Sequence, residues 1–344
     1  MKYLYIYKKY KLVIFLLKKM RLEDIIDKLK KREHLVLRTK NDFLQINAKY
    51  NSLNQIIGYE IIIRTTYRCN LNCRFCFVSD NFEVKEKWTD SFINELRKID
   101  LRGSCVVLSG GEPTLHPKYF DMLEKLKETG ASVITQTNGI LFSRDFFFNK
   151  LEMEDHSFFV SFPSPIEEEY NYITNSSLYK DFFIGVRKLS QRYNVSLNYV
   201  LYKENYESFE KALSLVYNHF NFKNIRLVIS NLGMLSKFDH INKLAKYSDI
   251  IECIREPISL YNDYINIRFT VTGGCSFPLC ILNKIISVEN ETFFKAIKEN
   301  IGFDNFEKQF FKSKKCFNCN YNDYCQGFPS EYIKMFGKNE IKPF

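Results

Sequence analysis

The stretch that decides the fold is YEIIIRTTYRCNLNCRFC, residues 59–76. Its first half, residues 59–66, is an apolar run rich in isoleucine and threonine, which predicts a buried β-strand. Three cysteines, Cys69, Cys73 and Cys76, follow in the next loop with the spacing CxxxCxxC. Thiolates are soft ligands, so three of them in one short loop can hold a soft metal centre. The stretch therefore predicts a strand whose C-terminal end carries a metal site.

The number of thiolates indicates what kind of metal site this is. A cubane 4Fe–4S cluster has four irons, so three cysteines leave one iron without a protein ligand. An open coordination position distinguishes a reactive metal site from a closed structural one. A cluster in this loop would therefore be able to bind a further molecule at its fourth iron.

Composition places the chain among folded proteins of a reducing compartment. It has 344 residues, of which 45% are hydrophobic, so it can bury a large core and is not mainly disordered. Its ten cysteines are too few and too clustered for a secreted disulfide scaffold and are typical of metal binding. The apolar run at residues 12–17 is far shorter than a membrane-spanning helix, and no signal-peptide cleavage site follows it. We therefore expect a cytoplasmic protein without a transmembrane segment.

The positive charge is concentrated at the N-terminus. Net charge is +10, and residues 1–40 hold thirteen Lys or Arg against four acidic residues, so the rest of the chain is close to neutral. A nucleic-acid binder usually spreads a basic stripe over its folded surface, so this distribution argues against nucleic acid as a partner. Residues 1–19 are interpreted as a solvated terminus; a non-native upstream extension and a basic arm that binds a membrane surface or a partner are the alternatives.

After the cysteine loop, short apolar runs alternate with amphipathic segments, the pattern of βα units and a parallel sheet. Six units are too few for a closed eight-stranded barrel, so we predict an α/β fold with a partial (β/α)6 TIM barrel. Strands are expected at residues 60–66, 104–109, 132–137, 157–163, 195–202 and 224–230. Helices are expected near residues 89–99, 117–129, 143–151, 177–192 and 206–219.

The pattern changes at both ends of this repeat. We predict a basic, helical N-terminal extension at residues 1–57, a core barrel at 58–237 and a small cysteine-rich domain at 238–344. Within the extension, a hairpin is expected between residues 35–37 and 43–46. In the C-terminal domain, a strand-like run covers residues 264–271.

A second motif, Ser-Gly-Gly-Glu-Pro, occupies residues 109–113 at the end of the second barrel strand. Together with the CxxxCx(aromatic)C loop, it resembles the radical S-adenosylmethionine (radical SAM) superfamily. The resemblance covers about residues 58–235 and implies that Cys69, Cys73 and Cys76 bind a 4Fe–4S cluster. It also implies that S-adenosylmethionine chelates the open iron through its amino and carboxylate groups.

The same resemblance assigns the cofactor-binding residues. Glu112 and the backbone of Gly110 and Gly111 would hold the methionyl ammonium, because glycine permits close backbone approach and a carboxylate pairs with a cation. Phe75 would pack near the adenine.

Later motif positions carry further expectations. Thr137 and Asn138 belong to the family's third-strand segment beside the cofactor. Ser161 stands where many members have a serine that contacts the ribose, although Pro163 replaces the aspartate that usually follows. Asn205 could contact the methionyl carboxylate or instead cap the following helix.

The C-terminal cysteines resemble the auxiliary-cluster region of SPASM and shorter "twitch" extensions of the superfamily. Pro329 stands where a full SPASM region has another cysteine, so one auxiliary 4Fe–4S cluster is expected rather than two. Its expected ligands are Cys316, Cys319, Cys325 and Cys280, with Cys275 as the alternative to Cys280. A tetrahedral zinc site remains open, because four cysteines with a CxxC knuckle suit zinc equally well.

The resemblance implies reductive cleavage of S-adenosylmethionine to a 5′-deoxyadenosyl radical, with an electron donor such as a flavodoxin or ferredoxin. We expect the radical to abstract hydrogen from a peptide or protein side chain, as in enzymes that mature ribosomal peptides. A small-molecule or cofactor-biosynthesis enzyme is the second hypothesis and RNA modification the third. A non-catalytic electron-transfer or structural iron–sulfur protein is the alternative outside enzymes.

Overall fold

The computed structural model describes residues 22–38, 44–51, 53, 55–76, 87–232, 241–271, 274–286 and 310–343. The chain divides into two compact units. The first unit comprises Met1–Asn70, Asn81–Thr137 and Arg144–Phe159; the second comprises Leu71–Asp80, Asn138–Ser143 and Val160–Phe344. In the described residues, none of the helices has the length and apolar character needed to cross a membrane.

The strands of the first unit follow chain order from β1 to β5. β1 pairs antiparallel with β2, and β2 pairs antiparallel with β3. β3, β4 and β5 are parallel. The bounds are Val36–Arg38 for β1, Leu44–Tyr50 for β2, Ile56–Thr66 for β3, Cys105–Gly110 for β4 and Ser132–Thr137 for β5. The predicted hairpin is confirmed by the pairing of Leu37 with Ile46, and its turn lies outside the described residues.

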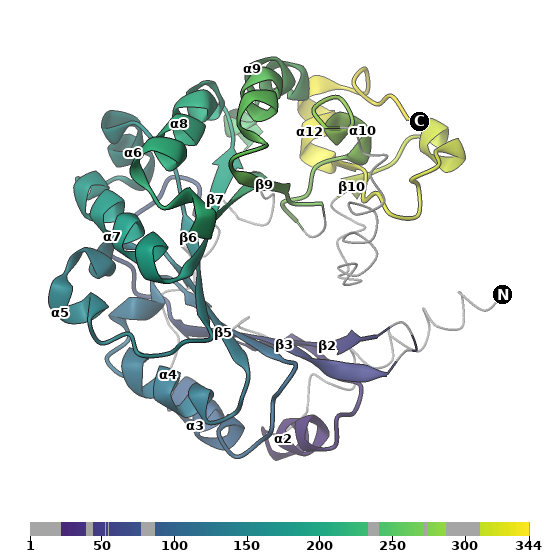
Figure 1. The fold of residues 1–344 in the computed structure, drawn as a ribbon. Helices are drawn as coiled ribbons and strands as arrows, with labels where there is room; N and C mark the ends of the chain where they lie inside the picture. Colours follow the sequence, from purple (N-terminus) through teal and green to yellow (C-terminus); the bar gives the residue numbers. More distant parts are fainter. Residues whose placement is uncertain are drawn as a thin grey trace. The chain divides into compact units, whose positions relative to one another are not determined.

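Helices cover one face of these strands (Figure 1). Their bounds are Leu22–Lys30 for α2, Lys87–Leu96 for α3, Tyr119–Lys127 for α4 and Asp145–Phe148 for α5. In β5, burial alternates along the strand, and Thr135 on its buried face exchanges a 2.9 Å hydrogen bond with Tyr119 of α4. The same Thr135 hydroxyl lies 2.9 Å from Nε2 of His156, so this polar group is satisfied inside the core.

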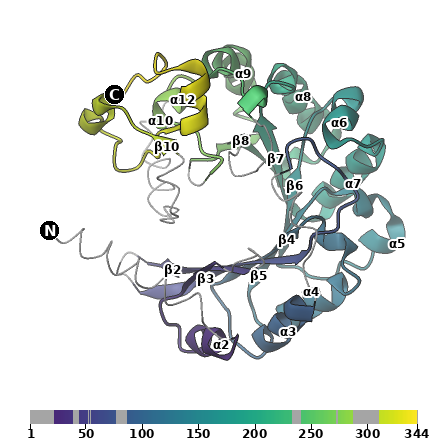
Figure 2. The same cartoon turned by 180° about the vertical axis from the view of Figure 1, so that it is seen from behind.

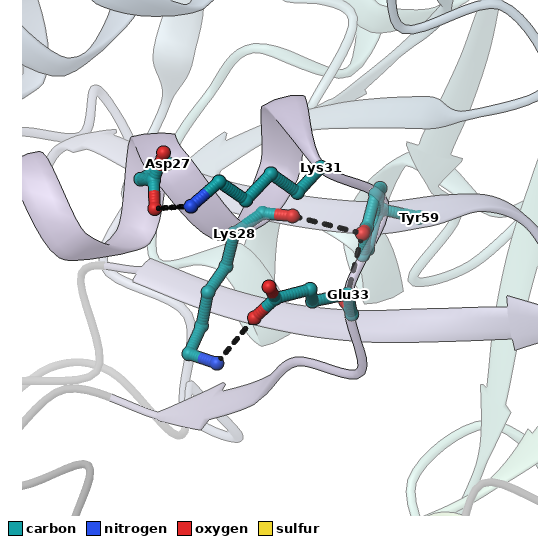
Figure 3. A network of polar contacts seen from close by, with 5 residues as sticks. All are labelled: Asp27, Lys28, Lys31, Glu33 and Tyr59. Carbon is teal, nitrogen blue, oxygen red and sulfur yellow. Dashed lines mark hydrogen bonds and ion pairs between the residues drawn. The ribbon is translucent and has the colours of Figure 1, made fainter.

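Helix α2 is attached to β3 through Tyr59 (Figure 3). The Tyr59 hydroxyl donates to the carbonyl oxygen of Glu33 at 2.8 Å and lies 3.5 Å from that of Lys28. Lys28 in turn forms a 2.9 Å ion pair with Glu33 across the end of α2. Because Tyr59 is 1% exposed, burial raises the pKa of its hydroxyl to about 12. The end of α2 is thus fixed on the strand that leads to the cysteine loop.

The second unit contains three parallel strands, β7 (Asn194–Leu201), β8 (Ile225–Asn231) and β9 (Asn266–Phe269). Figure 2 shows helices α8 and α9 side by side beyond β7 and β8. The helix bounds are Glu167–Thr174 for α6, Tyr179–Arg192 for α7, Phe209–His219 for α8, Tyr247–Tyr261 for α9, Leu279–Leu282 for α10 and Ser330–Phe336 for α12. A two-stranded sheet pairs β10 (Phe310–Phe311) with β11 (Phe328–Pro329).

Strand β6 (His156–Ser161) falls at the division between the units, and the strand order of the large sheet follows the chain from β1 to β9. This is the predicted α/β fold with a partial TIM barrel. Several features differ from the expectation, among them α10, α12 and the β10–β11 sheet, which were not predicted. The strand expected at 264–271 pairs in parallel with β8 and extends the large sheet. Helix α6 was not predicted. The expected boundary near residue 238 lies outside the described residues.

Candidate metal and cofactor site

In the first unit, the Gly-Gly-Glu-Pro turn lies directly against the chain that leads into the cysteine loop. The amide of Gly111 donates to the carbonyl oxygen of Thr66 at 2.8 Å, and the amide of Glu112 donates to that of Arg68 at 2.8 Å. Gly110 has φ +141°, and a Cβ atom there would lie 2.0 Å from the Thr66 oxygen. A Cβ on Gly111 would lie 2.5 Å from the oxygens of both Tyr67 and Arg68. Only glycine permits this close approach of two backbones.

Glu112 is completely buried and holds two other polar side chains. Its Oε1 accepts from the amide and the hydroxyl of Thr114, at 3.2 and 2.6 Å. It also accepts from the hydroxyl of Thr137 at 2.7 Å. The structure therefore brings together three of the predicted site positions, Gly111, Glu112 and Thr137, at the ends of β4 and β5. Thr114 is a fourth member that the sequence reasoning missed, since nothing in the motif marks it.

In the second unit, the part of the cysteine loop from Leu71 onward is attached to the C-terminal end of α6. The amides of Asn72 and Arg74 donate to the carbonyl oxygens of Thr174 and Ile173, at 3.1 and 2.9 Å. The Arg74 side chain donates through Nε to the Tyr172 oxygen at 2.9 Å and stacks its guanidinium 4.2 Å from the Tyr172 ring. The last carbonyls of a helix have no intrahelical partner, so the loop fills positions that would otherwise need water or a cap.

The cysteine side chains remain accessible in this arrangement. Cys69 is exposed, and Cys73 and Cys76 are partly exposed. Between the latter two, the amide of Cys76 donates to the carbonyl oxygen of Cys73 at 3.1 Å, which turns the chain back on itself. The loop thus presents thiols rather than burying them, as a cluster ligand loop requires.

Phe75 packs on Tyr202, with ring centroids 5.5 Å apart. Tyr202 is 1% exposed, and its hydroxyl has no hydrogen-bond partner among the described residues. Burial raises the pKa of Tyr202 far above its usual range, and the negative charges of Glu204 and Cys73 raise it further. A buried hydroxyl therefore lies behind the cysteine loop, a feature that the loop motif alone could not reveal.

Two further predicted cofactor residues lie at strand ends, Asn138 directly after β5 and Ser161 in β6. Asn138 is buried, and its Oδ1 accepts from the amide of Ile140 at 3.1 Å, starting the next turn. Ser161 is the last residue of β6 and is partly exposed.

Asn205 is held by side-chain hydrogen bonds to three backbone groups. Its Oδ1 accepts from the amide of Tyr202 at 3.0 Å, and its Nδ2 donates to the oxygens of Pro163 and Val200 at 2.9 and 2.8 Å. It makes no helix-capping side-chain bond, so the capping alternative is wrong. Its contact with a methionyl carboxylate stays a prediction. Through its side-chain hydrogen bonds Asn205 connects Pro163, which follows β6, to Val200 and Tyr202 at the C-terminal end of β7.

The C-terminal cysteines gather around one pocket of the second unit. Cys280, Cys316, Cys319 and Cys325 all line it, and Cys275 does not. The Cys325 sulfur accepts from the amides of Leu279 and Gly327 at 3.5 and 3.4 Å. Such N–H···S bonds are typical of metal-bound thiolates and adjust their electron density.

Burial raises the pKa of several C-terminal thiols. Burial raises the pKa of Cys280 to about 11, with a further contribution from the Cys325 charge. Burial likewise raises the pKa of Cys275 to about 11. In the described residues, no three His, Cys, Asp or Glu side chains already converge as they would around a bound ion. Four of the residues that line the pocket are nonetheless cysteines, a ligand set that suits iron–sulfur or zinc chemistry.

A partial α/β barrel with a three-cysteine loop after one parallel strand and a Gly-Gly-Glu-Pro turn after the next defines a class of enzymes that use a 4Fe–4S cluster. The family model of the Radical SAM superfamily matches residues 63–216. The match covers less than half of the chain, so it shows that residues 63–216 are similar to the radical SAM superfamily.

Individual relatives match over shorter stretches. The 7-carboxy-7-deazaguanine synthase of Aquifex aeolicus is 29% identical over 110 residues, 30% of this chain and 49% of the relative. The tungsten-containing aldehyde ferredoxin oxidoreductase cofactor-modifying protein of Pyrococcus furiosus is 28% identical over 92 residues, 24% of each chain. The chain thus spans less than half the length of these curated relatives.

Among solved structures, Streptococcus suis SuiB bound to precursor peptide SuiA has a similar fold, with a TM-score of 0.54 and 15% identity. The similarity covers 80% of this chain and 72% of that one. At this level of identity the likeness concerns the fold alone.

Proposed function

We propose that this chain is a radical SAM enzyme that modifies a peptide or protein substrate. The observation that carries the enzyme assignment is the pair of backbone hydrogen bonds from Gly111 and Glu112 to Thr66 and Arg68. These bonds join the two motifs of the family at the base of the cysteine loop. Cys69, Cys73 and Cys76 would hold the 4Fe–4S cluster, and Glu112 with the glycine backbone would receive the methionyl ammonium.

When bound, the cluster and S-adenosylmethionine would supply the radical chemistry for removing a hydrogen atom from the substrate. The chain contributes binding and orientation. Thr114 and Thr137 fix Glu112 Oε1, so the carboxylate keeps one orientation without rearrangement. Phe75, supported by Tyr202, offers a flat apolar surface for the adenine. Asn138 and Ser161 complete the proposed cofactor-binding set, and a flavodoxin or ferredoxin is the proposed electron donor in the cytoplasm.

For the C-terminal pocket, we propose an auxiliary 4Fe–4S cluster held by Cys280, Cys316, Cys319 and Cys325. The common pocket of these four thiols supports Cys280 over Cys275. Burial raises the pKa of Cys325, and the two amide donors to its sulfur oppose this rise because they stabilise negative charge on sulfur. Zinc in the same pocket remains the alternative, and metal content distinguishes the two.

The peptide substrate is supported by the fold likeness to SuiB, described with precursor peptide SuiA bound, and by the cysteine-rich C-terminal region. A small-molecule or cofactor-biosynthesis substrate is the second candidate. It is favoured by the sequence matches to the deazaguanine synthase and to the cofactor-modifying protein.

The test is anaerobic reconstitution with iron and sulfide, followed by dithionite and S-adenosylmethionine. We expect 5′-deoxyadenosine from the wild-type chain and from the control variant Cys253→Ala, whose thiol lies in α9. A variant with Cys69, Cys73 and Cys76 all replaced by alanine should give none. Wild-type product no higher than that of the triple variant would overturn the enzyme assignment.

A peptide encoded by a short reading frame beside the gene is the substrate probe. A loss of hydrogen mass from this peptide, measured by mass spectrometry, supports the peptide assignment. An unchanged peptide, together with turnover of a small-molecule candidate, would favour the second one.

A further inference from the structure

The parallel strands of the second unit have one face turned toward helices and one turned away from them. Burial alternates along β7 and over residues 225–229 of β8, and the buried set includes Tyr199, whose ring centroid lies 5.7 Å from that of Phe209 in α8. Successive side chains of a strand point to opposite faces. The residues between the buried ones therefore share the face opposite the helices, which we call the inner face of β7–β9.

The strand register arranges this inner face in three rows. In the first row, Ser196 pairs with Arg226 and Arg226 pairs with Asn266. In the second row, two residues further along each strand, Asn198 pairs with Val228 and Val228 pairs with Arg268. The third row holds Val200, Ser230 and Thr270, and Ser230 donates to Asn198 Oδ1 at 2.7 Å and lies 2.7 Å from Thr270 Oγ1. Arg226 and Arg268 are thus diagonal neighbours on adjacent strands.

The two arginines give this face an uncompensated positive charge. Both are exposed, and neither forms an ion pair with any residue in the described ranges. None of the nine positions of the three rows holds an acidic residue. A pair of guanidinium groups without a counter-charge, placed beside hydroxyl and amide groups, is suited to a bidentate oxyanion such as a carboxylate.

We propose that the inner face of β7–β9 binds a carboxylate of the substrate through Arg226 and Arg268. This inference rests on the proposed peptide-modifying function and names the chemistry of its substrate, a peptide with an acidic side chain or a free C-terminus. Ser230 and Asn198 border the site and keep it polar.

RNA is the competing anionic partner, and the composition of the face disfavours it. Recognition of single-stranded RNA relies on aromatic side chains on which bases stack. None of the nine positions carries an aromatic ring. Beyond residue 40 the chain is also close to neutral overall, so a phosphate backbone would find no extended basic track.

The test uses fluorescein-labelled peptides that differ only in Glu against Gln, each with a free or an amidated C-terminus. Binding to the reconstituted full chain is followed by fluorescence anisotropy. We expect the Glu peptide to bind more tightly than the Gln peptide. Arg226→Gln and Arg268→Gln should each weaken the Glu peptide about tenfold, the loss of one charged hydrogen bond. Arg268→Lys should fall between, because lysine lacks the planar fork.

Arg255→Gln is the matched control, since it removes the same charge from an exposed position on helix α9. It should leave peptide binding unchanged. A wild-type preference that follows the C-terminal amide rather than the Glu side chain assigns the carboxylate to the terminus. The Glu-to-Gln comparison on the wild-type chain needs no variant, so it holds even if an arginine variant fails to fold.

Equal affinity for all four peptides would overturn the proposal. So would an oligo(U) RNA that binds more tightly than any peptide and loses affinity in the same two arginine variants. Failure of the proposed function itself is seen separately, as absence of 5′-deoxyadenosine from the wild-type chain without peptide.

Discussion

The amide of Gly111 donates to the carbonyl oxygen of Thr66 at 2.8 Å, which places the turn after β4 against the end of β3. This contact leaves no space for a side chain, because a Cβ on Gly111 would lie 2.5 Å from two carbonyl oxygens. The local structure therefore depends on the absence of a methyl group.

We expect Gly111→Ala to lower stability by about 1–3 kcal/mol, the usual cost of overpacking. The cysteine loop should also retain less iron after reconstitution. Gly337→Ala is the control, since nothing lies within 4 Å of its Cβ position and only its φ of +75° adds strain. The melting temperature and the iron content are measured for both variants. Equal values for Gly111→Ala and Gly337→Ala would contradict the steric argument.

Arg74 anchors the cysteine loop on α6 through a hydrogen bond and a stacked ring. Loss of both in Arg74→Ala should cost about 1–2 kcal/mol locally. Hydrogen exchange of the Asn72 and Arg74 amides should then quicken about tenfold. Arg97→Ala, which removes an exposed arginine of the first unit, should leave these amides unchanged. Unchanged exchange in Arg74→Ala would mean that the backbone bonds alone hold the loop.

The Tyr202 hydroxyl and the Tyr202 ring should behave differently on substitution. Tyr202→Phe removes a buried hydroxyl without a hydrogen bond in the described residues, so stability should change by less than about 1 kcal/mol. Tyr202→Ala removes the ring beneath Phe75 and should cost about 3–5 kcal/mol. Denaturant unfolding measures both, and a large loss in Tyr202→Phe would reveal an unrecognised partner of the hydroxyl.

Metal analysis separates the two candidate ligands of the C-terminal pocket. The wild-type chain should bind about eight irons, and Cys325→Ala about four, if the pocket holds a second cubane. Cys275→Ala should keep about eight. About four irons with one zinc in the wild-type chain would instead establish the zinc alternative. A loss of iron in Cys275→Ala but not in Cys280→Ala would exchange their roles.

Tyr59 makes stability depend on pH in the alkaline range. Its pKa is about 12 in the fold and about 10 in the unfolded chain, so only the unfolded state loses the proton between these values. Its contribution is fully present below pH 10 and is lost progressively as the pH rises toward 12. Comparison of wild type with Tyr59→Phe in urea unfolding isolates this residue, and parallel pH curves for the two would contradict it.

The strands of the barrel could be predicted because each one is marked by a short pattern of consecutive residues. Strands β3 to β8 lie within a few residues of their expected positions, since each is a short apolar run bounded by turn residues. Helix α6 was missed because EEEYNYIT has no clear apolar stripe, and its burial of Tyr170 and Ile173 depends on packing with distant segments.

The sequence also could not indicate which strands pair with one another or which groups a side chain bonds to. The run at 264–271 reads as a strand, but nothing in it indicates that β8 is its neighbour. Asn205 likewise has the side chain of a helix cap, and only the fold shows that the oxygens of Pro163 and Val200 take its amide hydrogens. The cysteine and glycine motifs were readable because their chemistry lies within a few consecutive residues.

The contact between Gly111 and Thr66 also bears on how such sequences diverge. A related chain that lost all three cysteines of the loop would still need glycine where the two backbones meet. The paired glycines therefore indicate the architecture of the barrel, whatever chemistry such a chain performs.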